Sequence, residues 1–288
     1  MGGFFRDLLR YEFLQNAMLT GVLASICCGV VGTYVVTRRI SYIAGSISHC
    51  ILGGIGVARY LQVARGMTWM EPLYGATASA ILAALIIGFV SLRAKEREDT
   101  IIGALWAIGM AVGLLFMART PGYNADLMAY LFGNILMVTP KDLWLVFAID
   151  VVVLGCGLAF YNQLQAVCFD EEFARMRGVR VEFYYLLLLC LTALTVVLLV
   201  SVVGIILVIA LLTLPAAVAG HFSRTIRQMM LLSSVLCAAF IFGGLTLQYG
   251  PNLPAGPTII AVAGVAYFCA VLVAAGLRRM RRRFVAPR

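Results

Sequence analysis

Long apolar runs separated by short polar segments cover almost the whole chain. A run of about 20 mainly apolar residues is what an α-helix needs to cross the hydrocarbon core of a bilayer. The pattern predicts nine such helices, at residues 15–37, 47–64, 73–92, 101–118, 142–161, 183–201, 203–220, 229–248 and 258–277. Residues 183–220 could instead form one span and a half-helix, so we expect an all-α integral membrane protein with eight or nine spans. Pro215 predicts a kink or a break in its span.

The amino-acid composition agrees with a membrane location. Of the 288 residues, 62% are apolar and only 12% are charged, and the mean hydropathy is +0.99. Soluble domains contain roughly half apolar residues and about a quarter charged ones. A soluble fold of this length could not bury so much apolar surface, so we expect the lipid bilayer to surround the chain. The eight cysteines lie mostly inside apolar runs and form no C-x-x-C pair, which favours a packing role.

Basic residues are concentrated in alternate loops between the predicted spans. Most of the 22 Lys and Arg residues lie in five segments, at residues 38–39, 93–97, 175–180, 224–227 and 278–288. Because loops rich in Lys and Arg stay on the cytoplasmic side, nine crossings with the N-terminus outside and the C-terminus in the cytoplasm are predicted. The same bias explains the net charge of +9 without a nucleic-acid partner.

Two segments between spans are too polar to cross the bilayer. Residues 119–141 are predicted to form an outside loop that contains a short helix. Residues 162–182 carry acidic side chains early, arginines late and Gly178 as a stop. This order predicts a short helix at about residues 168–179 on the cytoplasmic face. On these residues alone, an ordinary charged helix at the membrane surface is an open alternative.

Few ionisable side chains fall at membrane depth, where each one is costly and is therefore a candidate for function. His49 lies near the start of the second span, with Ser46 on the same helical face and Cys50 beside it. A neutral imidazole commonly binds zinc and similar metals, although a packing histidine is the alternative. Asp150 falls within the fifth span, unless that span lies closer to the outer surface. Asp126 in the outside loop is either a helix cap or a cation ligand.

No catalytic signature is recognisable in the chain. The sequence has no G-x-x-x-x-G-K-[ST] loop, no H-E-x-x-H pair and no nucleophile elbow. The chain is therefore predicted not to be an enzyme, and ATP bound by a P-loop would have to belong to another subunit.

Four blocks of the sequence carry a resemblance to a transporter family. They are Arg38-Arg39-Ile40-Ser41-Tyr42 through His49, Asp126-Leu127-Met128-Ala129-Tyr130-Leu131-Phe132-Gly133 through Val138-Thr139-Pro140, Phe169-Asp170 through Gly178-Val179, and Val203-Gly204-Ile205 through Pro215-Ala216-Ala217 with Leu253-Pro254-Ala255-Gly256-Pro257-Thr258. In this order they resemble the permease subunit of bacterial zinc/manganese/iron ABC importers, the ABC-3 family, over residues 12–275. The likeness is closest to the zinc-uptake members.

The resemblance implies a single permease domain over residues 1–288, like that of a type II ABC importer, in the bacterial cytoplasmic (inner) membrane. A second copy would complete the pore as a homodimer, and an extracytoplasmic metal-binding protein would deliver the ion. The cargo would be a divalent metal, zinc first and manganese or iron(II) next, with no permanently bound cofactor. ABC ATPase subunits would dock on the cytoplasmic helix through Asp170, Glu171, Phe173, Ala174, Arg175 and Gly178.

One position departs from the family pattern. Where the family carries an Asp four residues before the His, this chain has Gly45. An Asp and a His at that spacing share a helix face and could hold a cation together. We therefore expect His49 to form a weaker site, or to borrow a carboxylate such as Asp126 or Asp150.

Two other classes of function compete with this interpretation. An ATP-independent secondary transporter would be expected to show buried acid relays and inverted repeats, which the sequence does not reveal. A membrane-embedded enzyme would need a catalytic constellation. Dependence of transport on an ATPase partner separates the importer from both.

Overall fold

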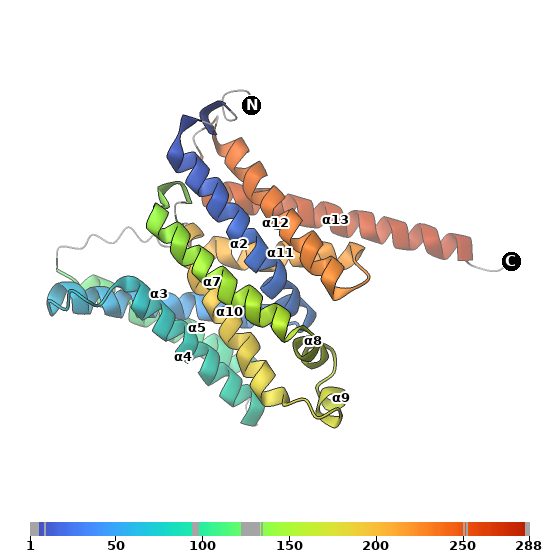
Figure 1. The fold of residues 1–288 in the computed structure, drawn as a ribbon, viewed down its shortest axis with the longest axis horizontal. Coiled ribbons are helices and arrows are strands. Elements are labelled where there is room, and N and C mark those ends of the chain that lie inside the picture. The colour runs from blue at the N-terminus through green and yellow to red at the C-terminus, as the bar shows by residue number, and fades with distance from the viewer. Residues whose placement is uncertain are drawn as a thin grey trace.

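The computed structural model describes residues 6–8, 10–93, 98–121, 133, 135–249, 251 and 253–285. Within these residues the regular structure is helical: α2 (Glu12–Thr37), α3 (Ser41–Ala64), α4 (Pro72–Arg93), α5 (Glu98–Arg119), η1 (Ile135–Met137), α7 (Pro140–Ala159), α8 (Tyr161–Phe169), α9 (Glu171–Met176), α10 (Val181–Val203), α11 (Ile205–Phe222), α12 (Ile226–Tyr249) and α13 (Ala255–Val285) (Figure 1).

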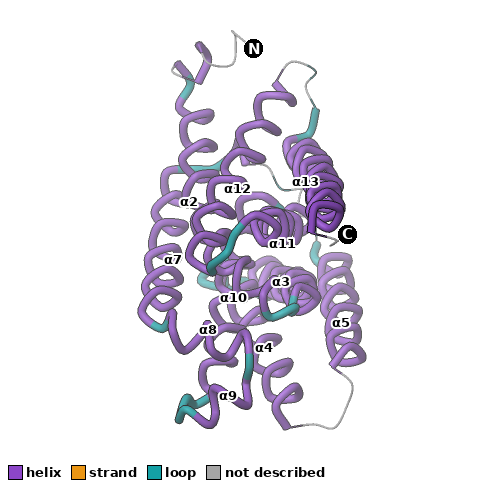
Figure 2. The backbone as a smooth tube through the Cα atoms, turned by 90° about the vertical axis from the view of Figure 1, so that its right-hand side faces the viewer, coloured by secondary structure: helices purple, strands orange, loops and turns teal. Residues whose placement is uncertain are grey.

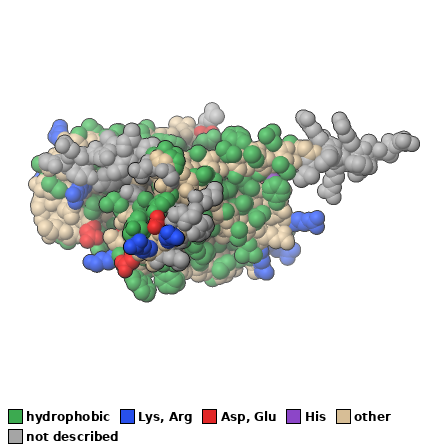
Figure 3. Space-filling model, turned by 90° about the horizontal axis from the view of Figure 1, so that it is seen from above, with side chains coloured by type: hydrophobic (Ala, Val, Ile, Leu, Met, Phe, Trp, Pro, Cys, Tyr) green, Lys and Arg blue, Asp and Glu red, His purple; other side chains and the backbone are tan. Residues whose placement is uncertain are grey.

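Nine of the helices in this described part of the chain are long and apolar enough to cross a membrane. The predicted all-α membrane fold is confirmed. Residues 183–220 belong to two spans, because Gly204 interrupts the helix with φ 83° and ψ 164°, a conformation that glycine adopts readily. Figure 3 shows hydrophobic side chains over much of one face, with a few charged ones among them.

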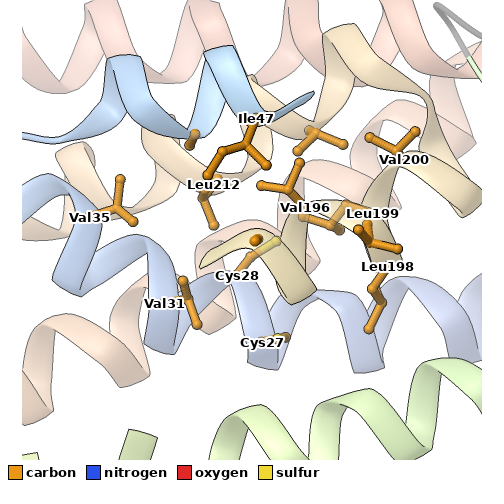
Figure 4. Close-up of a cluster of buried hydrophobic side chains, with 14 of the residues drawn as sticks. Cys27, Cys28, Val31, Val35, Ile47, Val196, Leu198, Leu199, Val200 and Leu212 are labelled. Atoms are coloured by element: carbon orange, nitrogen blue, oxygen red, sulfur yellow. The ribbon is translucent and has the colours of Figure 1, made fainter. Parts of the chain in front are cut away.

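Three helices, α2, α3 and α10, are mostly buried, whereas α5 and the apolar part of α13 have few buried residues. Figure 2 shows α10 and α11 inside the bundle, with α7 along one side and α5 along the other. The core contains side chains from four helices, namely Val31 and Val35 of α2, Ile47 of α3, Val196 of α10 and Leu212 of α11 (Figure 4). Burial of these side chains holds the central helices together.

Glycines let α3 lie very close to α5. A Cβ added to Gly53 would lie 2.8 Å from the carbonyl oxygen of Gly109, and one added to Gly56 would lie 2.6 Å from that of Gly113. Larger residues at these positions would push the helices apart. Close packing of small residues is a main source of helix association in lipid. It fixes α5 against α3 although most of the surface of α5 is exposed.

Of the kink or break predicted at Pro215, the break does not occur, because α11 is continuous from Ile205 to Phe222. Proline lacks an N–H group, so the carbonyl of Leu211, four residues earlier, loses its helical partner. The thiol of Cys237 on α12 donates to that oxygen at 3.9 Å. A neighbouring helix thus satisfies the freed carbonyl, which is one way in which membrane helices tolerate proline.

The helix predicted at residues 168–179 is part of a two-helix segment. α8 ends at Phe169, and Asp170 is extended at φ −154° and ψ 107° before α9 begins. The Asp170 side chain accepts a hydrogen bond from the N–H of Phe173 at 3.0 Å, so it starts a new helix as an N-cap. Both helices lie at one end of the bundle, opposite the N-terminus (Figure 1).

The outside loop predicted at residues 119–141 is described in part. Residues 135–137 form the single 3-10 turn η1, and α7 begins at Pro140. Thr139 and Asp142 form a reciprocal capping box at the start of α7. Residues 122–132 and 134, which include Asp126, lie outside the described residues.

Candidate functional site

His49 lies half-buried on α3 against Trp106 of α5. The two rings stack with their centroids 4.4 Å apart and their planes 19° from parallel. Nδ1 of His49 is buried and has no hydrogen-bond partner. In the tautomer that carries its proton on Nε2, the lone pair of this nitrogen is free to bind a metal ion. This nitrogen makes His49 the strongest single ligand candidate at membrane depth.

Ser46 and Cys50, the predicted neighbours of His49, are both engaged by α5. The Ser46 hydroxyl donates to the carbonyl oxygen of Ile102 at 3.0 Å, and the Cys50 thiol donates to that of Leu105 at 3.3 Å. Both side chains are buried. They tie α3 to α5 in this conformation, and they hold the helix that presents Trp106 to His49.

Trp106 also lies beside the position of the missing carboxylate. A Cβ added to Gly45 would lie 3.2 Å from Cζ3 of Trp106 and 3.6 Å from Cδ1 of Ile209 on α11. The first distance is tighter than an ordinary van der Waals contact, so a larger residue at position 45 requires the indole ring to shift. Gly45 and Trp106 are therefore sterically matched, and the indole lies along the helix face where the ABC-3 pattern has an aspartate.

Asp150 is buried inside the bundle, with only 2% of its surface exposed. Neither carboxylate oxygen has a hydrogen-bond partner. Its electrostatic neighbour is the thiol of Cys27 on α2, which in turn lies 3.4 Å from the hydroxyl of Thr195 on α10. Asp150 thus belongs to the contact between α2, α7 and α10.

The structure does not bring the candidate ligands together as one cage. The neighbours of His49 are on α5, whereas those of Asp150 are on α2 and α10. Among the residues described, no three His, Cys, Asp or Glu side chains form a group that could hold a metal ion. Asp126 falls outside the described residues. A borrowed carboxylate for His49 therefore stays a prediction.

A cavity of about 510 Å³ opens at the end of the bundle opposite α9. Two acidic residues line it, Glu71 just before α4 and Asp142 in the first turn of α7, together with Ile55 of α3 and Ser201 of α10. Asp142 Oδ2 accepts from the backbone N–H and the hydroxyl of Thr139. The acidic lining would attract a cation to this mouth of the bundle.

The α9 segment presents an exposed surface at the other end. Phe173 is 49% exposed and Met176 is 78% exposed, while Ala174 is fully buried and anchors the helix. Arg175 forms an ion pair with Glu182 of α10 at 2.8 Å. Beside it, a groove of about 360 Å³ is lined by Gln163, Gly178, Val179, Arg180, Phe183 and Tyr184. Exposed aromatic and methionine side chains are typical of a surface that another protein covers.

Residues 10–274 of the chain match the model of the ABC 3 transport family. The chain belongs to this family. A Chlamydia pneumoniae protein named "Probable metal transport system membrane protein" is 40% identical over 268 residues, which are 93% of this chain and 91% of that protein. The manganese transport system membrane protein MntC of Listeria monocytogenes is 33% identical over 271 residues, 94% of each chain.

A solved structure gives the same result for the fold of this ABC 3 family protein. The structure titled "PsaBC from Streptococcus pneumoniae in complex with Fab" superimposes with a TM-score of 0.82 at 31% sequence identity. The match covers 93% of this chain and 94% of that one. The resemblance inferred from the four sequence blocks is confirmed.

Several residues that shape the sites of this ABC 3 family protein were not anticipated from the sequence. Trp106 sits in an uninterrupted apolar run, where nothing distinguishes it from a lipid-facing residue. Glu71 and Asp142 are far apart in the sequence and line one cavity only because the starts of α4 and α7 both border it. The Thr139-Pro140-Lys141-Asp142 capping signal could have singled out Asp142, but only as a helix cap.

Proposed function

We propose that this chain is the transmembrane permease subunit of an ABC importer for divalent transition-metal ions, powered by a separate ATPase subunit. The observation that carries the proposal is the likeness to PsaBC, at 31% identity and a TM-score of 0.82 over 93% of the chain. The names of the relatives indicate which class of ion is transported, since one is named a probable metal transport protein and another a manganese transport protein.

Zinc and manganese are the two leading cargos, and iron(II) is the third. The resemblance read from the sequence blocks favours zinc, whereas the name of the Listeria relative favours manganese. Imidazole nitrogen suits zinc, while carboxylate and carbonyl oxygens suit manganese. A site built on His49 with Gly45 in place of an aspartate lacks the oxygen ligand that would favour manganese.

The proposed route of the ion begins at the cavity lined by Glu71 and Asp142 and passes His49. The acidic mouth would concentrate cations outside, and the unpaired nitrogen of His49 would provide a transient ligand at membrane depth. Transit requires binding that is weak enough to release the ion, so a site with few ligands serves better than a closed cage.

The partners follow from the same proposal. ATPase subunits dock on α9, where Phe173 and Met176 are exposed, and an extracytoplasmic binding protein delivers the metal. A second copy of the chain completes the pore. The basic loops place α9 and the C-terminus in the cytoplasm and the N-terminus outside, in a bacterial inner membrane.

Uptake into proteoliposomes tests the proposal. We expect the chain, reconstituted with its ATPase and binding protein, to accumulate zinc or manganese only when ATP is hydrolysed. Liposomes given a non-hydrolysable ATP analogue serve as the control, and competition between the two metals identifies the cargo. Equal uptake without the ATPase subunit would refute the importer and favour the secondary transporter.

A further inference from the structure

Arg38, the C-cap residue of α2, contacts three other helices at the α9 end of the bundle. Its Nη2 forms an ion pair with Glu171 in the first turn of α9, and its Nη1 donates to the carbonyl oxygen of Val167 on α8 at 2.6 Å. Its guanidinium group lies over the ring of Tyr185 on α10, with Cζ 4.5 Å from the centroid. One cation therefore joins α2, α8, α9 and α10.

The network continues to a fifth helix. The hydroxyl of Tyr185 shares a hydrogen bond of 3.2 Å with the Ser91 hydroxyl on α4. The Arg38 side chain is only 15% exposed, so water screens its interactions poorly. The planar guanidinium suits this place, because it can donate in two directions while it stacks on an aromatic ring.

The ion pair between Arg175 of α9 and Glu182 of α10 differs from this one in exposure. Arg175 and Glu182 have side chains that are 62% and 58% exposed, so their attraction is largely screened by solvent. The pair of Arg38 with Glu171 is the better sheltered of the two, at 15% and 40% exposure. Of these two ion pairs, the one made by Arg38 is therefore the stronger link between α9 and the transmembrane helices.

The turn that follows Arg38 leads directly to the candidate ligand. Arg39 has φ 63°, and among the described residues it is the one non-glycine residue with positive φ. Such a conformation is uncommon for residues other than glycine and is retained where surrounding contacts hold it. α3 begins two residues later at Ser41 and carries His49. A displacement of Arg38 would thus move both the end of α2 and the start of α3.

We propose that Arg38 is the positioning residue that transmits the movement of α9 to α2 and α3, and through α3 to His49. This inference rests on the proposed function, in which an ATPase docks on α9. Arg38 does not bind the metal in this scheme. It couples the position of α9 to the helices that form the route of the ion.

The test compares Arg38→Gln with Arg39→Gln in the complete complex in proteoliposomes. Arg39 is exposed and carries the same charge one residue away, so it is a matched control. For Arg38→Gln, we expect ATP hydrolysis and co-purification of the ATPase to persist while metal uptake per ATP falls by about tenfold. For Arg39→Gln, we expect this ratio to change less than about twofold, as for most surface substitutions.

Further variants separate coupling from folding. Glu171→Gln should lower the same ratio, and the double variant should be no worse than Arg38→Gln alone, because both remove one interaction. Arg38→Lys keeps the charge but not the planar contacts, so we expect an intermediate ratio. If the complex with Arg38→Gln does not assemble, the ratio of metal uptake to ATP hydrolysis in Glu171→Gln and Arg38→Lys tests the proposal instead.

Failure of the proposed function and failure of the coupling role of Arg38 give different results. If the wild-type complex takes up no metal with ATP, the proposed function is wrong. If the wild-type complex transports and the variants of Arg38 and Glu171 keep the normal ratio of uptake to hydrolysis, the coupling role alone is wrong.

Discussion

His49 on α3 and Asp150 on α7 are both ionisable residues inside membrane spans, yet their surroundings differ. His49 is half-buried, stacks on Trp106, and has a buried nitrogen without a hydrogen bond. Asp150 is only 2% exposed, and both of its oxygens lack hydrogen bonds inside the contact between α2, α7 and α10. Depth in the membrane alone therefore does not identify a transport ligand.

The two residues differ in how far the surrounding helices enclose their side chains. His49 lies where α3 meets α5, is half-buried, and is covered on one face of its ring by Trp106. Asp150 is enclosed by two of the most buried helices of the described chain, α2 and α10. We therefore expect a role in transport for His49 and a packing role for Asp150, and the predictions below test the surroundings of both residues.

The largest effect is expected for His49→Ala. Removing the imidazole should lower metal uptake by about tenfold or more, since changes at metal sites commonly cost that much. ATPase binding should be unchanged, because His49 contacts Trp106 of α5 and belongs to α3, not to α9. His221→Ala, at the exposed end of α11, is the control. Normal uptake by His49→Ala would remove His49 from the route.

The second effect is a change of metal preference in Gly45→Asp combined with Trp106→Ala. The double variant would place a carboxylate and an imidazole four residues apart on one helix face, with the indole removed. We expect the ratio of manganese to zinc uptake to rise by about threefold to tenfold, because oxygen ligands suit manganese. Gly45→Asp alone should give a smaller change, since the Trp106 ring occupies the space. Equal ratios for the single and double variants would contradict the steric match.

A smaller effect on stability is expected for Ser46→Ala. This change removes the hydrogen bond to the carbonyl of Ile102 and should lower the free energy of unfolding by about 1 kcal/mol. The choice of metal should stay the same, since the hydroxyl is engaged by α5. Thermal unfolding in detergent and metal competition measure the two quantities separately. A change in metal preference without loss of stability would make Ser46 a ligand.

The smallest effect is expected for Asp150→Asn. The amide has the shape of the carboxyl group and can keep the contact with the thiol of Cys27. Uptake should stay within about twofold and the free energy of unfolding within about 1 kcal/mol. The assay is the same proteoliposome uptake as for His49→Ala. A loss as large as that of His49→Ala would show that Asp150 takes part in transport.

Much of the fold could be predicted from local sequence because the bilayer sets the length of each span. The nine apolar runs correspond to nine candidate spans in the described residues, and the acidic start and Gly178 stop mark α9. These signals depend on hydropathy and on helix ends, which are properties of neighbouring residues. The division of this segment at Asp170 was not predicted, because its side chain caps α9 where the sequence indicated one helix at about residues 168–179.

Contacts between distant segments were decided by the tertiary structure alone. α11 continues through Pro215, and Cys237, on another helix, satisfies the freed carbonyl of Leu211. The surroundings of His49 likewise depend on Trp106, which α5 brings to α3 through paired glycines. Hydropathy reports how far each residue prefers lipid over water, so it determined that this chain crosses the membrane and where. Hydropathy does not determine which helices are neighbours. The neighbouring helices decide whether a buried polar group is a ligand, a packing contact or a link between helices.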